Sequence, residues 1–129
     1  MILLDTCAII WDALETSKLT PKAKKAIQQA ENELLICDIS IWEISMLIKK
    51  KRLLVDDTTS GFINLLFQAR NFHIQEITPK IAELSVNFGT EINNDPADRL
   101  IAATSILMNA PIITADQNIR DATILETIW

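Results

Sequence analysis

The sequence predicts an α/β domain with a central, mainly parallel sheet of four to five short strands and helices on both faces. Two observations indicate this fold class. Short apolar runs alternate along the chain with longer segments whose apolar residues recur at the helical period, as in parallel sheets covered by helices. Hydrophobic residues make up 49% of the 129 residues, which is enough for one compact core. We therefore expect a single domain over residues 1–129.

The expected strands are short and differ in polarity. Ile2–Leu4 and Leu34–Cys37 contain only apolar residues, which is typical of buried strands. Residues 72–77 alternate apolar and polar side chains, which predicts a half-buried strand with His73 exposed. Two further strands are expected over residues 111–114 and 124–126.

The expected helices begin at capping residues or prolines. Thr20 precedes Pro21, and Thr78 precedes Pro79, so a hydroxyl N-cap comes before a proline in each first turn. The helices are predicted over residues 7–13, 21–30, 40–50, 58–70, 79–87 and 96–109. Helical spacing predicts that the helices at 40–50 and 58–70 each turn one apolar face to the core. The face of the helix at 40–50 consists of Ile41, Ile44, Leu47 and Ile48, and that of the helix at 58–70 consists of Phe62, Leu65, Leu66 and Ala69. We interpret Trp42 and Met46 as packing residues as well.

Composition excludes several classes of protein. The chain has only two glycines, so it contains neither a P-loop nor a dinucleotide-binding fingerprint. Its formal net charge of -5 argues against a protein that coats nucleic acid, but not against an enzyme that acts on it. Cys7 and Cys37 lack metal-site spacing. No apolar stretch reaches the roughly 20 residues of a membrane span, and residues 1–4 are too short for a signal-peptide core. We expect a cytoplasmic protein without a membrane partner.

Four acids occur where strands end or helices begin. Asp5 follows the first strand, Asp116 follows the strand at 111–114, and Glu43 and Asp98 lie in the first turn of their helices. Functional groups of parallel α/β sheets gather at the carboxyl ends of the strands, so these four side chains are expected to converge. Converging carboxylates need a cation, and oxygen-only ligands suit Mg²⁺ or Mn²⁺.

Each acid also has a purely structural explanation. Ser40 and Glu43 have the spacing of a capping box, and so do Asp95 and Asp98. Asp5 and Asp116 could cap the helical turns that follow them, where the helix dipole favours negative charge. Capping explains the four acids less well as a group, because acids that converge without a cation repel one another. Two like charges 4 Å apart repel by roughly 4 kcal/mol at an effective dielectric of 20. The basic run from Lys49 to Arg52 is either a solvated helix end or an edge that contacts phosphate.

The chain resembles PIN-domain proteins of the VapC toxin type over essentially its whole length. The resemblance depends on four segments in order, which are Leu3-Leu4-Asp5-Thr6, Ser40-Ile41-Trp42-Glu43-Ile44, Asp95-Pro96-Ala97-Asp98-Arg99-Leu100-Ile101-Ala102-Ala103 and Ile113-Thr114-Ala115-Asp116. Close relatives often carry basic residues just before the Asp-Pro pair, whereas this chain has Asn93-Asn94.

The resemblance implies a Mg²⁺- or Mn²⁺-dependent endoribonuclease with Asp5, Glu43, Asp98 and Asp116 as catalytic and metal-binding residues. Glu43 or Asp116 would orient the attacking water, and the products would carry a 5′-phosphate and a 3′-hydroxyl. Thr114 would support the acids, and Asp95 would cap its helix. Arg99 would be a phosphate-binding, charge-balancing or surface residue.

The resemblance also implies an RNA substrate, a VapB-like antitoxin and a homodimer. The amphipathic helices at 41–50 and 58–70 are candidates for a groove that receives an antitoxin helix. Two other classes of protein stay open, which are a non-catalytic PIN-like module that binds RNA or protein and a receiver-like phosphoacceptor domain. A receiver domain would need a lysine after a late strand, where this chain has Thr114-Ala115-Asp116.

Overall fold

The sheet is wholly parallel in the computed structural model, which describes residues 1–30 and 33–129. Within those residues the sheet has five strands in the order β3-β2-β1-β4-β5. They are β1 (Ile2–Leu4), β2 (Leu34–Cys37), β3 (His73–Gln75), β4 (Ile112–Ile113) and β5 (Thr127–Ile128). The predicted α/β fold with a mainly parallel sheet is confirmed.

The helices begin within a residue or two of the predicted positions, and threonine caps, among them the predicted Thr78, are found at several helix starts. Thr58 and Thr78 accept hydrogen bonds from the amides of Gly61 and Ile81, at 3.1 and 3.2 Å. The helices are α1 (Thr6–Leu14), the 3-10 turn η1 (Thr16–Lys18), α2 (Pro21–Ala30), α3 (Ile39–Lys49), α4 (Thr59–Ala69), α5 (Pro79–Asn87), α6 (Pro96–Met108) and α7 (Gln117–Asp121).

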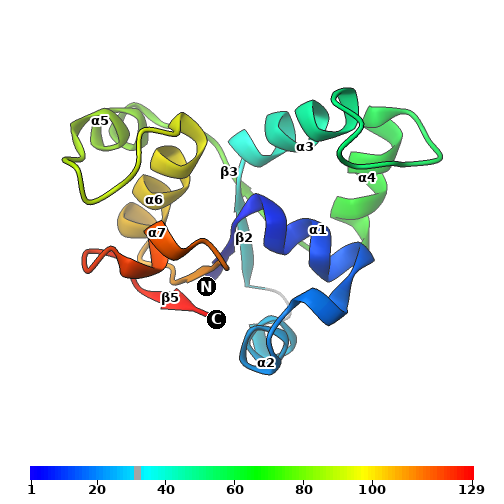
Figure 1. Cartoon of the computed structure of the whole chain (residues 1–129), viewed down its shortest axis with the longest axis horizontal. Coiled ribbons are helices and arrows are strands. Elements are labelled where there is room, and N and C mark those ends of the chain that lie inside the picture. Colours follow the sequence, from blue (N-terminus) through cyan, green and yellow to red (C-terminus); the bar gives the residue numbers. More distant parts are fainter. Residues whose placement is uncertain (31–32) are drawn as a thin grey trace.

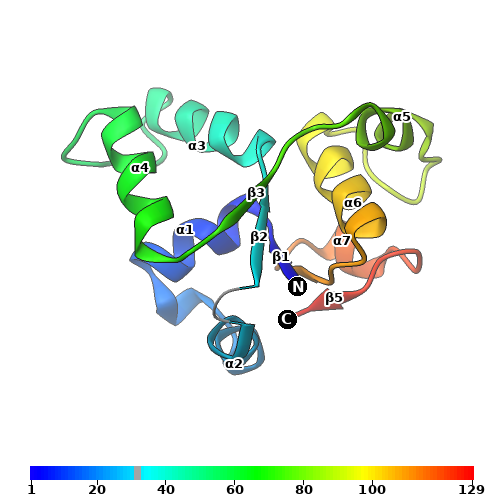
Figure 2. The ribbon, with the colours of Figure 1, turned by 180° about the vertical axis from the view of Figure 1, so that it is seen from behind.

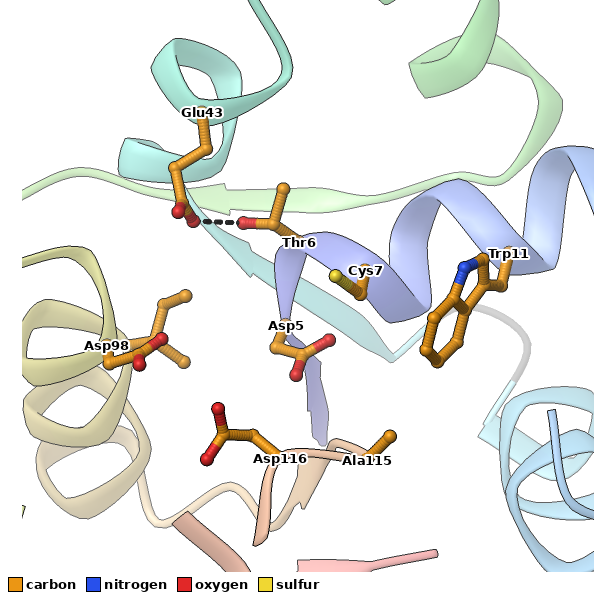
Figure 3. A pocket seen from close by; sticks show the side chains of 9 residues that line it. Asp5, Thr6, Cys7, Trp11, Glu43, Asp98, Ala115 and Asp116 are labelled. Carbon is orange, nitrogen blue, oxygen red and sulfur yellow. Dashed lines mark hydrogen bonds between the residues drawn. The ribbon is translucent and has the colours of Figure 1, made fainter. Parts of the chain in front are cut away.

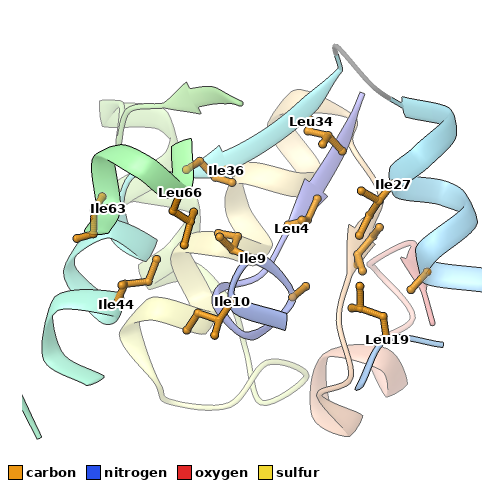
Figure 4. Packing of buried hydrophobic residues seen from close by; sticks show 13 residues of the cluster. Leu4, Ile9, Ile10, Leu19, Ile27, Leu34, Ile36, Ile44, Ile63 and Leu66 are labelled. Atoms are coloured by element: carbon orange, nitrogen blue, oxygen red, sulfur yellow. The ribbon is translucent and has the colours of Figure 1, made fainter. Parts of the chain in front are cut away.

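Helices cover both faces of the sheet, as predicted (Figures 1 and 2). Alternate strand residues point to opposite faces. Leu4, Leu34 and Ile36 pack against α1, α2, α3 and α4 on one side, in the cluster shown in Figure 4. Leu3 and Leu35 pack against α6 and α7 on the other. Both faces are therefore dry, which accounts for the uninterrupted apolar runs of the central strands.

Several local predictions are wrong. The buried face of α4 consists of Ile63 and Leu66, whereas Leu65 is 60% exposed, since the helix is rotated about one residue from the predicted orientation. The last strand is β5 at Thr127–Ile128 rather than at 124–126, because pairing with β4 determines its position. Trp42 is 58% exposed and is not a packing residue.

The helices are too short to form a long continuous apolar segment. No helix in the described ranges, 1–30 and 33–129, is both long and apolar enough to cross a bilayer.

A carboxylate pocket as the candidate active site

The strand order places two of the predicted acids side by side. The chain adds β2 and β3 on one side of β1 and then β4 and β5 on the other, so the order reverses beside β1. Asp5 follows β1, and Asp116 follows β4, whose Ile113 pairs with Leu4. Parallel α/β sheets form their ligand crevice at such a reversal, outside the carboxyl ends of the strands.

The helices bring the other two predicted acids to the same place. Glu43 comes from α3 and Asp98 from the first turn of α6, and both face Asp5 and Asp116 across a cavity of about 280 Å³ (Figure 3). The complete lining consists of Asp5, Thr6, Cys7, Trp11, Glu43, Asp98, Ile101, Ala115 and Asp116. All four acids singled out from the sequence therefore surround one pocket.

Asp5 serves both as a helix cap and as a wall of this pocket. Its Oδ1 accepts a hydrogen bond from the amide of Ala8 at 2.8 Å, which caps α1. The side chain is only 9% exposed. Burial raises the pKa of Asp5 to about 6, and the negative charges of Asp98 and Asp116 add to the rise, against hydrogen bonds from Thr114 and Ala8. Asp5 thus remains anionic at neutral pH in an environment that disfavours its charge.

Glu43 and Asp98 are affected in the same direction. Burial raises the pKa of Glu43, with further contributions from Asp95, Asp98 and Asp5. Burial likewise raises the pKa of Asp98, with contributions from Asp95 and Asp116. Because neighbouring carboxylates add to the raised pKa values of Asp5, Glu43 and Asp98, the pocket is a region of negative potential that positive charge would relieve.

The predicted capping box at Ser40 and Glu43 is wrong. The N-cap of α3 is Asp38, and Ser40 is fully buried, with its Oγ 2.9 Å from the Oγ1 of Thr6. The hydroxyl of Thr6 donates to Glu43 Oε1, which directs this carboxylate into the pocket (Figure 3). Glu43 therefore has no capping role in α3.

Asp98 also lacks a capping role, because Asp95 fills that position. Asp95 Oδ1 accepts from the amide of Ala97 at 2.9 Å, as predicted for the N-cap of α6. Asp98 Oδ2 instead accepts from the side-chain amide of Asn93 at 2.8 Å. Asn93 thus fixes the orientation of a pocket carboxylate.

Arg99 is half-buried, and its guanidinium donates to backbone carbonyls. Its Nε donates to the carbonyl of Ser85 at 2.9 Å, and its Nη1 donates to the carbonyls of Ile92 and Asn93 at 3.2 and 3.1 Å. Its Nη2 donates to the carbonyl of Phe88. The guanidinium therefore ties α6 to α5 and to the loop that carries Asn93.

Thr6, Cys7, Trp11 and Asn93 have no role in the site predicted from the sequence. Thr6, Cys7 and Trp11 line the pocket, and Asn93 contacts Asp98 from a neighbouring loop. Thr6 and Asn93 lie in or beside the motifs identified in the sequence, but their hydrogen bonds to Glu43 and Asp98 join separate elements and could not be inferred from the sequence. Cys7 is exposed at the rim of the pocket, and desolvation together with the negative charges of all four acids raises the pKa of its thiol to about 11. Thr114 is fully buried, and its hydroxyl accepts from the amide of Asp116 at 3.0 Å.

The charged groups that line the pocket are all carboxylates, which suit Mg²⁺ or Mn²⁺. The thiol of Cys7 also lines the pocket, but its raised pKa opposes the thiolate form that binds zinc. In the ranges 1–30 and 33–129, no three His, Cys, Asp or Glu side chains form a finished coordination group. Asp5, Glu43, Asp98 and Asp116 instead accept hydrogen bonds from Ala8, Thr6, Asn93 and Ile119, respectively.

Comparisons with known proteins agree with this geometry. The model of the PIN domain family matches residues 2–125. Ribonuclease VapC22 of Mycobacterium tuberculosis (strain ATCC 25618 / H37Rv) is 31% identical over 119 residues, which cover 92% of this chain and 89% of that protein.

Solved structures share the fold. VapBC2 from Rickettsia felis, bound to a promoter DNA fragment, contains a chain with a TM-score of 0.73 and 16% identity, covering 98% of this chain and 97% of that one. A toxin-antitoxin complex from Klebsiella pneumoniae contains a chain with a TM-score of 0.68 and 24% identity, with the same coverage.

Proposed function

The chain belongs to the PIN-domain family, and on this premise we propose that it is a divalent-metal-dependent endoribonuclease of the VapC type, the toxin of a toxin–antitoxin pair. One observation carries the proposal. Four carboxylates from four separate elements surround one pocket, although neither Glu43 nor Asp98 caps its own helix. A group of mutually repelling acids is costly to the fold unless it binds a cation.

The residues divide into two roles. Asp5, Asp98 and Asp116 would hold the cation together with Glu43, and the bonds from Thr114 and Asn93 would keep Asp5 and Asp98 correctly oriented. Glu43 also has a raised pKa and a fixed bond from Thr6, which suits a group that orients water and accepts its proton.

The cation would supply two things when bound, namely a lower pKa for a water molecule and compensation of the charge on the scissile phosphate. Attack by water in line with the leaving 3′-oxygen would leave a 5′-phosphate and a 3′-hydroxyl. The carboxylates would determine where the phosphate lies through the cation that they hold, because without a cation they would repel the phosphate.

The test is RNA cleavage by purified protein free of antitoxin, in Mg²⁺ or Mn²⁺, with product ends identified by mass spectrometry. Asp5→Asn and Asp98→Asn should each lower kcat/KM by more than about 100-fold, beyond the 10- to 100-fold typical of outer-shell residues. Asp56→Asn is the matched control, because Asp56 is an exposed acid outside the pocket. Wild-type protein that binds RNA without cutting it would instead favour the non-catalytic module.

We also propose an antitoxin partner and a homodimer. The relatives named above as toxin-antitoxin complexes support the first. The exposed Leu65 on α4 offers an apolar contact for an antitoxin helix. Leu65→Lys should leave stability unchanged and weaken antitoxin binding, as measured by calorimetry with the protein encoded beside this gene, and unchanged affinity would rule out this face. Light scattering of the isolated protein tests the homodimer.

A further inference from the structure

A second hollow opens beside the carboxylate pocket and has no role in the chemistry described above. This hollow, called here the α3 groove, has a volume of about 670 Å³ and runs between α3 and the beginning of α6. Thr6, Cys7 and Glu43 line both hollows, so the two share one wall. An RNA strand with one phosphate at the carboxylates can therefore extend from the carboxylate pocket into the α3 groove.

One row of side chains on α3 forms the long wall of the groove. Trp42 and Met46 lie four residues apart on one face of α3, and Lys50, the C-cap of the helix, follows at the same spacing. The core-facing side of α3 carries Ser40 and Ile44 instead, and both are fully buried. The row is therefore not required for packing.

Trp42 is the most unusual member of this row. It is 58% exposed, whereas Trp11 packs against Trp129 with ring centroids 5.9 Å apart. A large aromatic ring on an exposed helix face costs hydrophobic free energy unless something covers it. The groove supplies an apolar setting around it through Met46, Leu47 and Pro96. A flat ring in such a setting suits a flat ligand that stacks on it.

The far end of the groove is basic. Lys50 and Arg52 line it, both are exposed, and neither forms an ion pair with any residue in the described part of the chain. The end near the pocket is acidic instead, since Glu43 and Asp95 lie there. Negative groups of a ligand should therefore lie beside Lys50 and Arg52, in a chain whose overall charge is -5.

We propose that the α3 groove binds the nucleotides of single-stranded RNA next to the scissile phosphate, with one base stacked on Trp42 and the neighbouring phosphates held by Lys50 and Arg52. This inference rests on the proposed nuclease function. An exposed aromatic ring followed by cations along a groove is the arrangement by which proteins bind unpaired nucleic acid. RNA is favoured over an antitoxin segment because the groove shares its wall with the carboxylates, where the scissile phosphate must lie.

The first experiment measures binding of a labelled eight-nucleotide RNA by fluorescence anisotropy, with Ca²⁺ in place of Mg²⁺. Trp42→Ala should weaken binding by roughly 5- to 150-fold, which is the range for loss of one base–aromatic stack. Trp42→Phe keeps an aromatic face and should bind within about threefold of wild type. Because Trp42 is exposed, both variants should fold, and circular dichroism checks this.

The salt dependence of RNA binding tests the contribution of Lys50 and Arg52 independently of Trp42. The double variant Lys50→Gln and Arg52→Gln should reduce the slope of log affinity against log salt by about 0.7 for each phosphate that the protein no longer neutralises. The matched control is Lys22→Gln with Lys25→Gln, which removes the same charge from exposed positions of α2. That control should leave the slope unchanged.

Substrate length separates this inference from the proposed function. Extending a dinucleotide to a hexanucleotide should raise kcat/KM less for Trp42→Ala than for wild type, because the variant keeps only Lys50 and Arg52 in the groove, while dinucleotide cleavage stays equal in both. Equal RNA affinity and equal length dependence in the two proteins would overturn the groove assignment and leave the nuclease intact. Loss of antitoxin binding with unchanged RNA binding would assign the groove to the antitoxin. Absence of cleavage by wild type would overturn the nuclease function.

Discussion

At the residue scale, Asp5 shows how the pocket opposes the stability of the fold. Its carboxylate is buried at the end of a buried strand, beside two other acids. The hydrogen bonds from Ala8 and Thr114 favour its charged form, but they do not balance burial and repulsion, because the net effect is a raised pKa. An ionised Asp5 therefore destabilises the metal-free protein.

Asp5→Asn should stabilise the metal-free protein, and the effect should depend on pH. The folded pKa of Asp5 is about 6 and the reference value is 3.8, so stability falls as pH rises from 4 to above 6. Below about pH 3 Asp5 is mostly protonated in both the folded and the unfolded state, and the variant should match wild type. At pH 7.5 it should gain about 3 kcal/mol in free energy of unfolding.

Urea denaturation in EDTA at pH 3.0 and 7.5 measures this difference. Asp56→Asn serves as the control, because Asp56 is exposed and lies outside the pocket. A gain of equal size at both pH values, or a loss at pH 7.5, would contradict the account of Asp5.

Asn93→Ala should weaken the response to metal without unfolding the protein. The amide of Asn93 donates to Asp98 and lowers the pKa of that carboxyl, so its removal should move the acid limb of the pH–rate profile to higher pH. Half-saturation should require roughly 10-fold more Mg²⁺, as for other residues that orient metal ligands. Its neighbour Asn94 is exposed, and Asn94→Ala should behave as wild type in the same Mg²⁺ titrations.

At the element scale, α6 combines a structural and a functional role within one turn. Asp95 caps the helix, Asp98 faces the pocket, and Arg99 donates to carbonyls of α5 and of the loop at 88–93. The loop in turn carries Asn93, which contacts Asp98. Helix and loop therefore hold one carboxylate from two sides, and Arg99 acts on the site only through this loop.

Arg99→Lys should lower the free energy of unfolding by about 2–4 kcal/mol. One ammonium group cannot replace the planar fork that now reaches four carbonyls, and buried carbonyls left without donors are costly. Arg120→Lys is the control, because Arg120 is exposed and makes one long bond of 3.4 Å to Gln117. Equal midpoints of urea denaturation for Arg99→Lys and wild type would refute this role.

At the scale of the whole molecule, the strand order forms the site. Reversal of the order beside β1 places the ends of β1 and β4 together, and α3 and α6 contribute the remaining acids from the two sides of the sheet. The folded protein should therefore bind divalent cations in a way that the unfolded chain cannot. Such binding couples metal to global stability.

Mg²⁺ or Mn²⁺ should raise the Tm of the wild-type protein. At 100 times Kd the expected stabilisation is about 2.7 kcal/mol, which corresponds to a rise of several degrees for a chain of this size. Asp98→Asn should lose most of the rise, whereas Asp56→Asn should keep it. Differential scanning calorimetry measures both, and an equal rise in all three proteins would indicate binding outside the pocket.

The sequence by itself determined the fold class and the identity of the four acids. Apolar runs of three or four residues that alternate with amphipathic segments are local features, so strands and helix caps such as Thr78 and Asp95 can be predicted from neighbouring residues. The acids could be singled out because they follow strands or begin helices, and the parallel fold then implied that they meet.

Only the tertiary structure decided what each of these acids contacts. The hydrogen bonds from Thr6 to Glu43 and from Asn93 to Asp98 join separate elements of the fold. The exposure of Trp42 depends on how α3 packs against its neighbours. The same holds for Leu65, since a rotation of α4 by one residue exchanges buried and exposed positions. Helical periodicity says that a helix has an apolar face, but packing between elements determines which side chains the core covers.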